Sequence, residues 1–243
     1  MFTEIIPLNN KGIECMRNGD IRKATSCFVT ALERLKKTSL MAESKADRNT
    51  LVPISVHWSV PLPQKVFLTQ SYVYSRALQI VSRIDERKFK SSSHPNKNIS
   101  PNRRIWKNVT IREYKTAAWE ITVAVLFNLA LLLHMKGCNT NKSELLRRSL
   151  RAYEVVLGML RKNSPTLRSV RTCLSLALVN NIGLVYAEFH AYEQAERYFE
   201  QIDPLLDRVD VEQTTACCIM DESEHDGFAM NSLWEQPRLA AAA

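Results

Sequence analysis

The side chains most able to do chemistry in this sequence are histidines, cysteines and one dense run of cations. The histidines lie far apart and none has the short spacing of a metal site: His57, His94, His134, His190 and His225. Neither a phosphate-binding glycine loop nor a nucleophile elbow is present. We therefore expect a protein that is not an enzyme, with no catalytic residues, no bound metal and no cofactor.

The six cysteines show neither a CxxC pair nor a metal-ligand spacing. They are Cys15, Cys27, Cys138, Cys173, Cys217 and Cys218. We interpret them as small apolar residues in a reducing compartment, because cysteine behaves as a small hydrophobe there. An exposed redox pair at the adjacent Cys217 and Cys218 is the alternative.

The cations gather between Arg83 and Lys115, where ten Lys or Arg residues accompany three acids. This segment supplies nearly all of the formal net charge of +8. Three interpretations stay open: a solvated loop, docking onto the acidic residues 209–243 of the same chain, or binding to nucleic acid or an anionic membrane. For nucleic acid, Trp106 or Tyr114 would stack on bases.

Length and composition favour a mainly helical protein that can bury a core. The chain has 243 residues, is 45% hydrophobic and contains only 6 Gly and 9 Pro. Its longest apolar run, Ile121 to Met135, is shorter than the roughly 20 residues of a membrane span, so we expect a buried helix there. The first residues lack a signal-peptide pattern, which predicts an intracellular protein, cytoplasmic or nuclear.

Two stretches share one spacing of small and aromatic residues. The first holds Gly12, Cys15, Ala24, Phe28 and Ala31, and the second holds Gly183, Tyr186, Ala195, Phe199 and Ile202 at the same steps. An asparagine lies two residues before each glycine. A degenerate copy begins at Asn128-Leu129-Ala130 and continues at Ser149, Tyr153 and Val156. Small side chains let two helices approach closely, and such pairs need stacked neighbours to bury their apolar faces. The spacing therefore predicts helical hairpins.

We expect one domain over residues 1–243, with about three hairpins and a long insertion. The hairpins cover 5–37, 117–161 and 164–208, the irregular basic insertion covers 38–116, and an acidic tail covers 209–243. Gly19 and Asp20 are suited to the first turn, Ser164-Pro165 to a helix start, and residues 137–143 to a loop. Residues 67–81 suit a strand or a short helix; we favour a strand, which could pair with residues 228–234 as a short two-stranded β element.

The spacing resembles that of the tetratricopeptide repeat (TPR), although the closing proline of that pattern is missing. The layout is also similar to a TPR-like group of proteins expanded in diatom genomes. That group shares an NxGxxxxxxGD hairpin (here 10–20), an LFNLALLLHMKG helix (126–137), a VNNIGLVYAEF helix (179–189) and a Leu-Ala-rich end (239–243). The resemblance implies a helical-repeat fold and a role in protein–protein interaction. Its structural repeat positions fall on Gly12, Ala24, Phe28, Ala130, Tyr153, Gly183, Tyr186, Ala195 and Phe199.

TPR arrays bind peptides on the concave surface formed by the first helix of each hairpin. The resemblance places this surface one residue after, or three before, each small position: Asn9, Ile13, Phe127, Leu131, Asn180 and Leu184. Asparagine amides can hydrogen-bond a peptide backbone, and the apolar residues offer pockets. We expect an interaction scaffold that binds a peptide or protein partner there. The alternatives are that the insertion or the tail covers this surface, or that the chain binds nucleic acid through residues 83–115.

Overall fold

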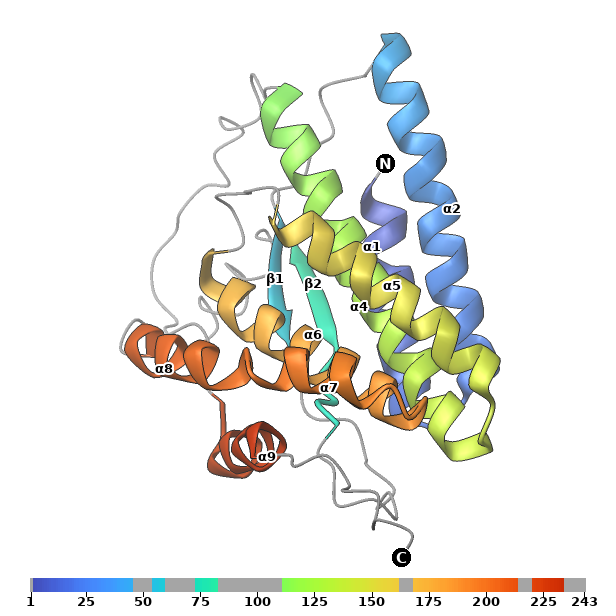
Figure 1. Cartoon of the computed structure of the whole chain (residues 1–243). Coiled ribbons are helices and arrows are strands. Elements are labelled where there is room, and N and C mark those ends of the chain that lie inside the picture. The colour runs from blue at the N-terminus through green and yellow to red at the C-terminus, as the bar shows by residue number, and fades with distance from the viewer. Residues whose placement is uncertain are drawn as a thin grey trace, which may run out of the picture. The chain divides into compact units, whose positions relative to one another are not determined.

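The computed structural model of the chain describes residues 2–45, 54–59, 73–82, 111–161, 168–213 and 220–233. These residues are mainly helical and include a two-stranded antiparallel sheet, as the sequence predicts (Figure 1). Proximity of Cα atoms groups the chain into two compact units. Unit 1 consists of Met1–Ser59 and Ala77–Leu129, and unit 2 consists of Val60–Arg76 and Ala130–Ala243.

Unit 1 begins with a short 3-10 helix, η1 (Phe2–Glu4), followed by two helices, α1 (Ile5–Arg17) and α2 (Ile21–Lys45). Gly19 turns the chain between them with a φ of 74°, which favours glycine. Asp20 caps α2, because its Oδ1 accepts the N–H of Lys23. Both residues therefore act as the sequence predicts. However, α2 continues past the expected end of the first hairpin, so residues 38–45 of the predicted insertion are helical.

The contact between α1 and α2 centres on Gly12. A Cβ atom at this position would lie 2.6 Å from Cε1 of Phe28, so the aromatic ring occupies the space that any other side chain needs. Phe28, Ala24 and Ala31 have no exposed surface. A buried Phe side chain contributes about 2 kcal/mol to stability, and the missing side chain of Gly12 is what permits this burial.

The sheet of unit 1 pairs β1 (Ile54–Trp58) with β2 (Leu78–Ser82), and Val56 lies opposite Ile80. The prediction of a strand within residues 67–81 is therefore right near its end, but the predicted partner is wrong. Residues 228–232 belong to a helix, α9 (Glu222–Ser232). The missed signal is a capping box, since Asp221 and Glu224 bond each other's backbone N–H groups and start that helix.

Helix α4 (Ile111–Thr140) runs from unit 1 into unit 2 and is followed by α5 (Ser143–Arg161). The loop predicted over residues 137–143 is wrong up to Thr140, because these residues continue the helix. The turn consists of Asn141, with a φ of 50°, and Lys142. Gly137 serves a close contact instead of a turn, since a Cβ atom there would lie 2.7 Å from the side chain of Leu146.

The rest of unit 2 contains α6 (Arg168–Glu188), α7 (Tyr192–Phe199), α8 (Ile202–Gln213) and α9. The second helix of the third hairpin was expected to run unbroken to residue 208, but it breaks between Phe199 and Ile202. Pro204 explains the break, because in a continuous helix its ring would clash with the carbonyl of Glu200. In the first turn of α8 the same proline is tolerated. The acidic tail is helical over α9 and the end of α8, and Ser164-Pro165 lies outside the described residues.

Among the described helices, one segment is long and apolar enough to cross a membrane by those two measures. It is Lys115–Thr140 in α4, with a mean hydropathy of 1.8. Of its most apolar window, 61% is buried inside the protein, and buried core helices meet the same two criteria. This burial agrees with the interpretation of Ile121 to Met135 as a core helix.

Candidate functional site

The candidate site is built around residues 73–82, which we call the gripped segment. The chain passes from unit 2 into unit 1 between Arg76 and Ala77. Most of its residues are buried: Val73, Tyr74, Ser75, Ala77, Leu78 and Ile80. A buried backbone needs hydrogen-bond partners for its N–H and C=O groups. At three residues of the gripped segment, both groups bind the side-chain amide of one asparagine.

Two of these asparagines belong to unit 1. The Oδ1 atom of Asn128 on α4 accepts the N–H of Leu78 at 2.7 Å, and its Nδ2 atom donates to the Leu78 carbonyl at 2.9 Å. Asn10 on α1 binds Ile80 in the same way, at 3.1 Å and 2.8 Å. We call such a pair of bonds an asparagine clamp. Each clamp reproduces the bonding of a neighbouring β-strand, because one amide offers both an acceptor and a donor.

The two sides of the gripped segment use different partners in unit 1. Successive residues of a strand point their N–H and C=O groups to opposite sides. Leu78 and Ile80 point theirs toward asparagines, while the Ala77 carbonyl accepts the N–H of Ser59 at 2.8 Å and the Ala77 N–H donates to Ser59 Oγ. The edge of β2 that does not face β1 is therefore covered by side-chain amides.

Unit 2 contains a third clamp. Asn181 on α6 accepts the N–H of Tyr74 at Oδ1, at 3.0 Å, and donates from Nδ2 to the Tyr74 carbonyl at 3.1 Å. Asn181 and Asn128 have no exposed surface, while Asn10 is only partly buried. Each clamp lies two residues before a small residue of the repeat spacing: Gly12, Ala130 or Gly183. The recurrent asparagine before each small residue is thus the sequence signal that marks the clamps.

The groove residues predicted from the TPR resemblance are all buried: Asn9, Ile13, Phe127, Leu131, Asn180 and Leu184. The two asparagines among them lie beside the clamps. Asn9 donates to the Leu78 carbonyl at 3.0 Å and accepts from Asn128 at 2.9 Å. Asn180 donates to Asn181 Oδ1 at 3.1 Å and accepts from Asn231 on α9 at 2.6 Å. Asn9 and Asn180 thus orient the clamps. The predicted asparagines are therefore the sequence neighbours of Asn10 and Asn181, which bind the backbone.

The predicted repeat positions lie in the helix contacts. Ala24, Phe28, Ala130, Tyr153, Gly183, Ala195 and Phe199 are buried. A Cβ atom at Gly183 would lie 2.6 Å from Cε1 of Phe199, the same arrangement as Gly12 with Phe28. Tyr186 is only half-buried; its hydroxyl donates to Glu154 at 3.0 Å and its ring stacks on Tyr198. Burial and this hydrogen bond raise the pKa of Tyr186 to about 12.

A buried polar network supports the clamp of unit 2. Besides its bond to Tyr74, Asn181 Nδ2 donates a hydrogen bond to the Tyr153 hydroxyl at 3.3 Å. This hydroxyl lies 3.5 Å from Nδ1 of His134. Burial lowers the pKa of His134 to about 4, so its ring is neutral near pH 7 and can accept at Nδ1. Its Nε2 atom has no hydrogen-bond partner among the described residues. The orientation of Asn181 therefore depends on an aromatic side chain backed by a neutral histidine.

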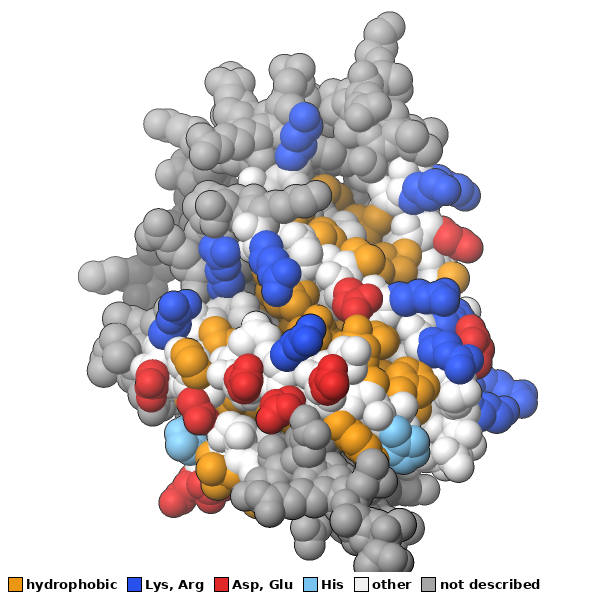
Figure 2. Space-filling model, in the orientation of Figure 1, with side chains coloured by type: hydrophobic (Ala, Val, Ile, Leu, Met, Phe, Trp, Pro, Cys, Tyr) orange, Lys and Arg blue, Asp and Glu red, His pale blue; other side chains and the backbone are white. Residues whose placement is uncertain are grey.

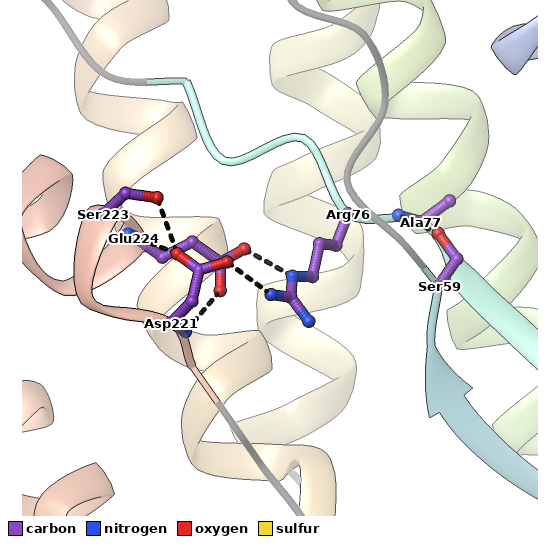
Figure 3. A network of polar contacts seen from close by, with 6 residues as sticks. All are labelled: Ser59, Arg76, Ala77, Asp221, Ser223 and Glu224. Carbon is purple, nitrogen blue, oxygen red and sulfur yellow. Dashed lines mark hydrogen bonds and ion pairs between the residues drawn. The ribbon is translucent and has the colours of Figure 1, made fainter.

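Side chains of the gripped segment are also held in unit 2. The ring of Tyr74 stacks on Phe228 of α9, with ring centroids 5.2 Å apart. The guanidinium of Arg76 faces two carboxylates at the start of α9, which approach it from the same side (Figure 3). Its Nη2 atom donates to Asp221 Oδ2 at 3.0 Å, and its Nε atom donates to Glu224 Oε1.

The same two carboxylates form the capping box of α9. Asp221 Oδ1 accepts the N–H of Glu224 at 3.0 Å, and Glu224 Oε2 accepts the N–H of Asp221 at 3.2 Å. Each acid thus uses one oxygen to fix the helix start and the other to bind Arg76. Burial raises the pKa of Glu224 despite the neighbouring cation, while a hydrogen bond from Ser223 is the main cause that lowers the pKa of Asp221. Because the capping box holds both carboxylates in place, they form a preorganised site for a guanidinium.

Neither a protein-family model, nor a curated protein, nor a solved structure matches this chain. Within the described ranges, no three His, Cys, Asp or Glu residues gather into a metal site. Most of the basic segment, residues 83–110, lies outside those ranges, as do Cys217 and Cys218. The nucleic-acid alternative therefore stays a prediction from the sequence. The interpretation of the cysteines as reduced thiols is wrong for Cys173, which is disulfide-bonded, whereas Cys15, Cys27 and Cys138 are free. The geometry defines one site in each unit: the clamps of Asn10 and Asn128 in unit 1, and in unit 2 the clamp of Asn181 with the α9 residues that hold Tyr74 and Arg76.

Proposed function

We propose that this chain is a non-enzymatic, intracellular interaction scaffold of the TPR-like kind, which binds polypeptide segments through asparagine clamps. The observation that carries the proposal is the clamp itself, because Asn10, Asn128 and Asn181 each bind the backbone N–H and C=O of one residue. The equal contacts of Gly12 with Phe28 and of Gly183 with Phe199 support hairpins that repeat one design.

A clamp of this kind is suited to recognising a polypeptide in an extended conformation. It bonds groups that every residue except proline carries, so it supplies affinity without demanding a particular side chain. The clamps of Asn128 and Asn181 are buried, and an unpaired amide in such a place costs about 1–3 kcal/mol. These asparagines therefore favour any state in which a backbone fills them, whichever chain supplies it.

In the structure the chain's own gripped segment fills the clamps. An intramolecular occupant competes at a high effective concentration, so the apparent affinity for a partner is the intrinsic affinity multiplied by the small fraction of clamps that are open. The scaffold that we propose therefore exchanges its own segment for a partner segment. The partner competes for the same asparagine amides, and it needs side-chain contacts of its own to displace the gripped segment.

A selection from displayed random ten-residue peptides, with the full chain as bait, tests this function. We expect enriched peptides that bind saturably. In a chain that carries Tyr74→Ala with Arg76→Ala, so that the resident segment competes weakly, Asn181→Ala should weaken their binding about tenfold, because it removes two hydrogen bonds. Glu222→Gln, at an exposed position of α9, is the matched control and should change nothing. If no peptide is enriched, or if Asn181→Ala leaves the affinity of that chain for the enriched peptides unchanged, the scaffold proposal is wrong.

A further inference from the structure

The part of the gripped segment that lies in unit 2 is held by its side chains as well as by its backbone. Tyr74 is 4% exposed, and its ring covers Phe228, which has no exposed surface. Two residues later, the side chain of Arg76 is 17% exposed and binds Glu224, which is 5% exposed. These contacts select a side-chain pattern, an aromatic residue followed at the second position by arginine. The clamp of Asn181 fixes where that pattern lies along the chain.

We propose that unit 2 is a receptor for peptide segments of other proteins that carry an aromatic residue two positions before an arginine. Residues Tyr74 to Arg76 are the resident copy of that motif. This inference rests on the proposed function, since it names the partner that the clamps accept. Three features of the site carry it: the amide of Asn181 for the backbone, the ring of Phe228 for the aromatic residue, and the two carboxylates for arginine.

Arginine suits the acidic end of this site better than lysine does. Asp221 Oδ2 and Glu224 Oε1 accept from two different nitrogens of one guanidinium, which a planar fork of donors can satisfy at once. A lysine ammonium is a point charge without this fixed geometry. The start of a helix carries a partial positive charge, which attracts anions and repels cations. A cation therefore binds there only where the negative charge of fixed carboxylates exceeds this partial charge. The capping box of α9 provides such carboxylates.

The surroundings of the site also favour a cationic partner. Acidic side chains gather over α7 and α8 of the same unit (Figure 2). Exposed carboxylates on these helices and on the turn between them include Glu193, Glu200, Asp203 and Asp207. The cations of these two helices are Arg197 and Arg208. An excess of carboxylates attracts a basic segment over about a Debye length, so binding should weaken as salt is raised.

The test uses the full chain in which the resident motif has been erased by Tyr74→Ala with Arg76→Ala. The probe is a fluorescent synthetic peptide with the sequence of residues 71–78, SYVYSRAL. We expect saturable binding to this variant and at least about tenfold weaker binding to the wild type, whose own segment competes. Replacing Arg76→Gln or Tyr74→Ala in the peptide should each weaken binding about tenfold, because a charged hydrogen-bond pair or a buried ring is lost.

Variants of the receptor side sharpen the result. Glu224→Gln keeps the capping box, since glutamine serves at that position too, but it removes the charge and should weaken the peptide about tenfold. Asp226→Asn, an exposed acid on the same helix, is the control and should leave the Kd unchanged. If circular dichroism shows that the double variant is unfolded, Arg76→Gln alone replaces it as the receptor.

The possible results distinguish a failure of the aromatic-and-arginine motif from a failure of the scaffold proposal. If every peptide binds equally, whatever its aromatic or arginine content, while Asn181→Ala weakens binding about tenfold, the motif is wrong and the backbone scaffold stands. If neither receptor variant binds any peptide, both proposals are wrong. If the wild type is a dimer that falls apart on adding the peptide, the motif is read from a second copy of this chain, and a partner in another protein is wrong.

Discussion

The two units grip one stretch of chain with the same asparagine device but complete the site differently. In unit 1, Leu78 and Ile80 lie in a strand between the clamps and β1, so hydrogen bonds of the backbone hold both of its edges. In unit 2, Tyr74 lies outside the strands and has one clamp, while its ring and the neighbouring Arg76 are held by α9. Binding of the backbone and selection of side chains are thus separate contributions. Both units bind the backbone of the gripped segment, and unit 2 also binds the side chains of Tyr74 and Arg76.

The largest effects should come from the glycine that each unit packs against an aromatic ring. Gly12→Leu and Gly183→Leu should each destabilise the protein by about 3 kcal/mol or more, because the added atoms would overlap Phe28 or Phe199. Gly158 in α5 is the control, since a Cβ placed there would meet no described heavy atom within 4 Å apart from its chain neighbours and the nearby backbone of its own helix. Gly158→Ala should stabilise α5 by about 0.5–1 kcal/mol, as alanine does in a helix interior. Urea unfolding measures all three, and a wild-type midpoint for either leucine variant would disprove the shared contact.

The second effect distinguishes the units by pH. Asn128 in unit 1 is supported by Asn9, whereas Asn181 in unit 2 is supported by Tyr153 and His134. The pKa of His134 is lowered from 6.5 to about 4, so the unfolded chain binds more protons between these values. Stability is therefore full above pH 6.5 and falls as the pH drops toward 4, by about 3 kcal/mol in all.

His134→Gln should remove this part of the pH dependence. Because carboxylates also titrate in this range, the informative quantity is the difference in unfolding free energy between the wild type and the variant, measured by urea at several pH values. We expect the difference to shrink as the pH is lowered from 6.5 to 4. A difference that is the same at every pH would show that His134 is not buried as described.

The clamps themselves come next. Asn128→Ala and Asn181→Ala should each cost about 2 kcal/mol, since each removes two buried hydrogen bonds to the backbone of the gripped segment. Asn10→Ala should cost less, about 1 kcal/mol, because water can reach this partly buried clamp. Thermal or urea unfolding gives the order. Equal and negligible costs for all three would mean that the amides do not bind the backbone.

The smallest effects concern one ion pair in each unit. Arg76→Gln in unit 2 should cost about 1 kcal/mol or more, because Arg76 pairs with a buried carboxylate, and salt should change this cost little, because burial limits screening. Arg34→Gln in unit 1 should change stability by less than about 0.5 kcal/mol, since the pair of Arg34 with Glu4 is exposed. Unfolding at low and high salt measures both variants. A larger cost for Arg34→Gln would contradict the distinction between the units.

The sequence predicted the steric part of this fold well. Gly12 and Gly183 are buried against the aromatic residues expected from their spacing, because small-to-large contacts within one hairpin are local and periodic. The breaks were harder to predict. Pro204 ended a helix that the apolar pattern continued, and the capping box of Asp221 started a helix where alternation suggested a strand. Such terminal signals depend on one or two residues and are easily outweighed by a pattern.

The sequence predicted Asn9 and Asn180 as binding residues, each one position before an asparagine that binds the backbone. The sequence showed a recurrent asparagine before each small residue, but not that Leu78 or Tyr74 would fill its amide, because these partners are 50 and 107 positions away. Pairing between distant segments leaves no periodic trace in a single sequence. For the same reason the link from Arg76 to Asp221, 145 positions apart, had no signal beyond two opposite charges.

Amide hydrogen exchange measured residue by residue by NMR tests the central claim most directly, which is that single asparagines hold single residues of the gripped segment. The N–H groups of Tyr74 and Leu78 should exchange slowly in the wild type. Asn181→Ala should speed exchange at Tyr74 and leave Leu78 protected, and Asn128→Ala should do the reverse. If both variants leave both amides as protected as in the wild type, or if either amide exchanges freely in the wild type, the asparagines do not clamp this segment.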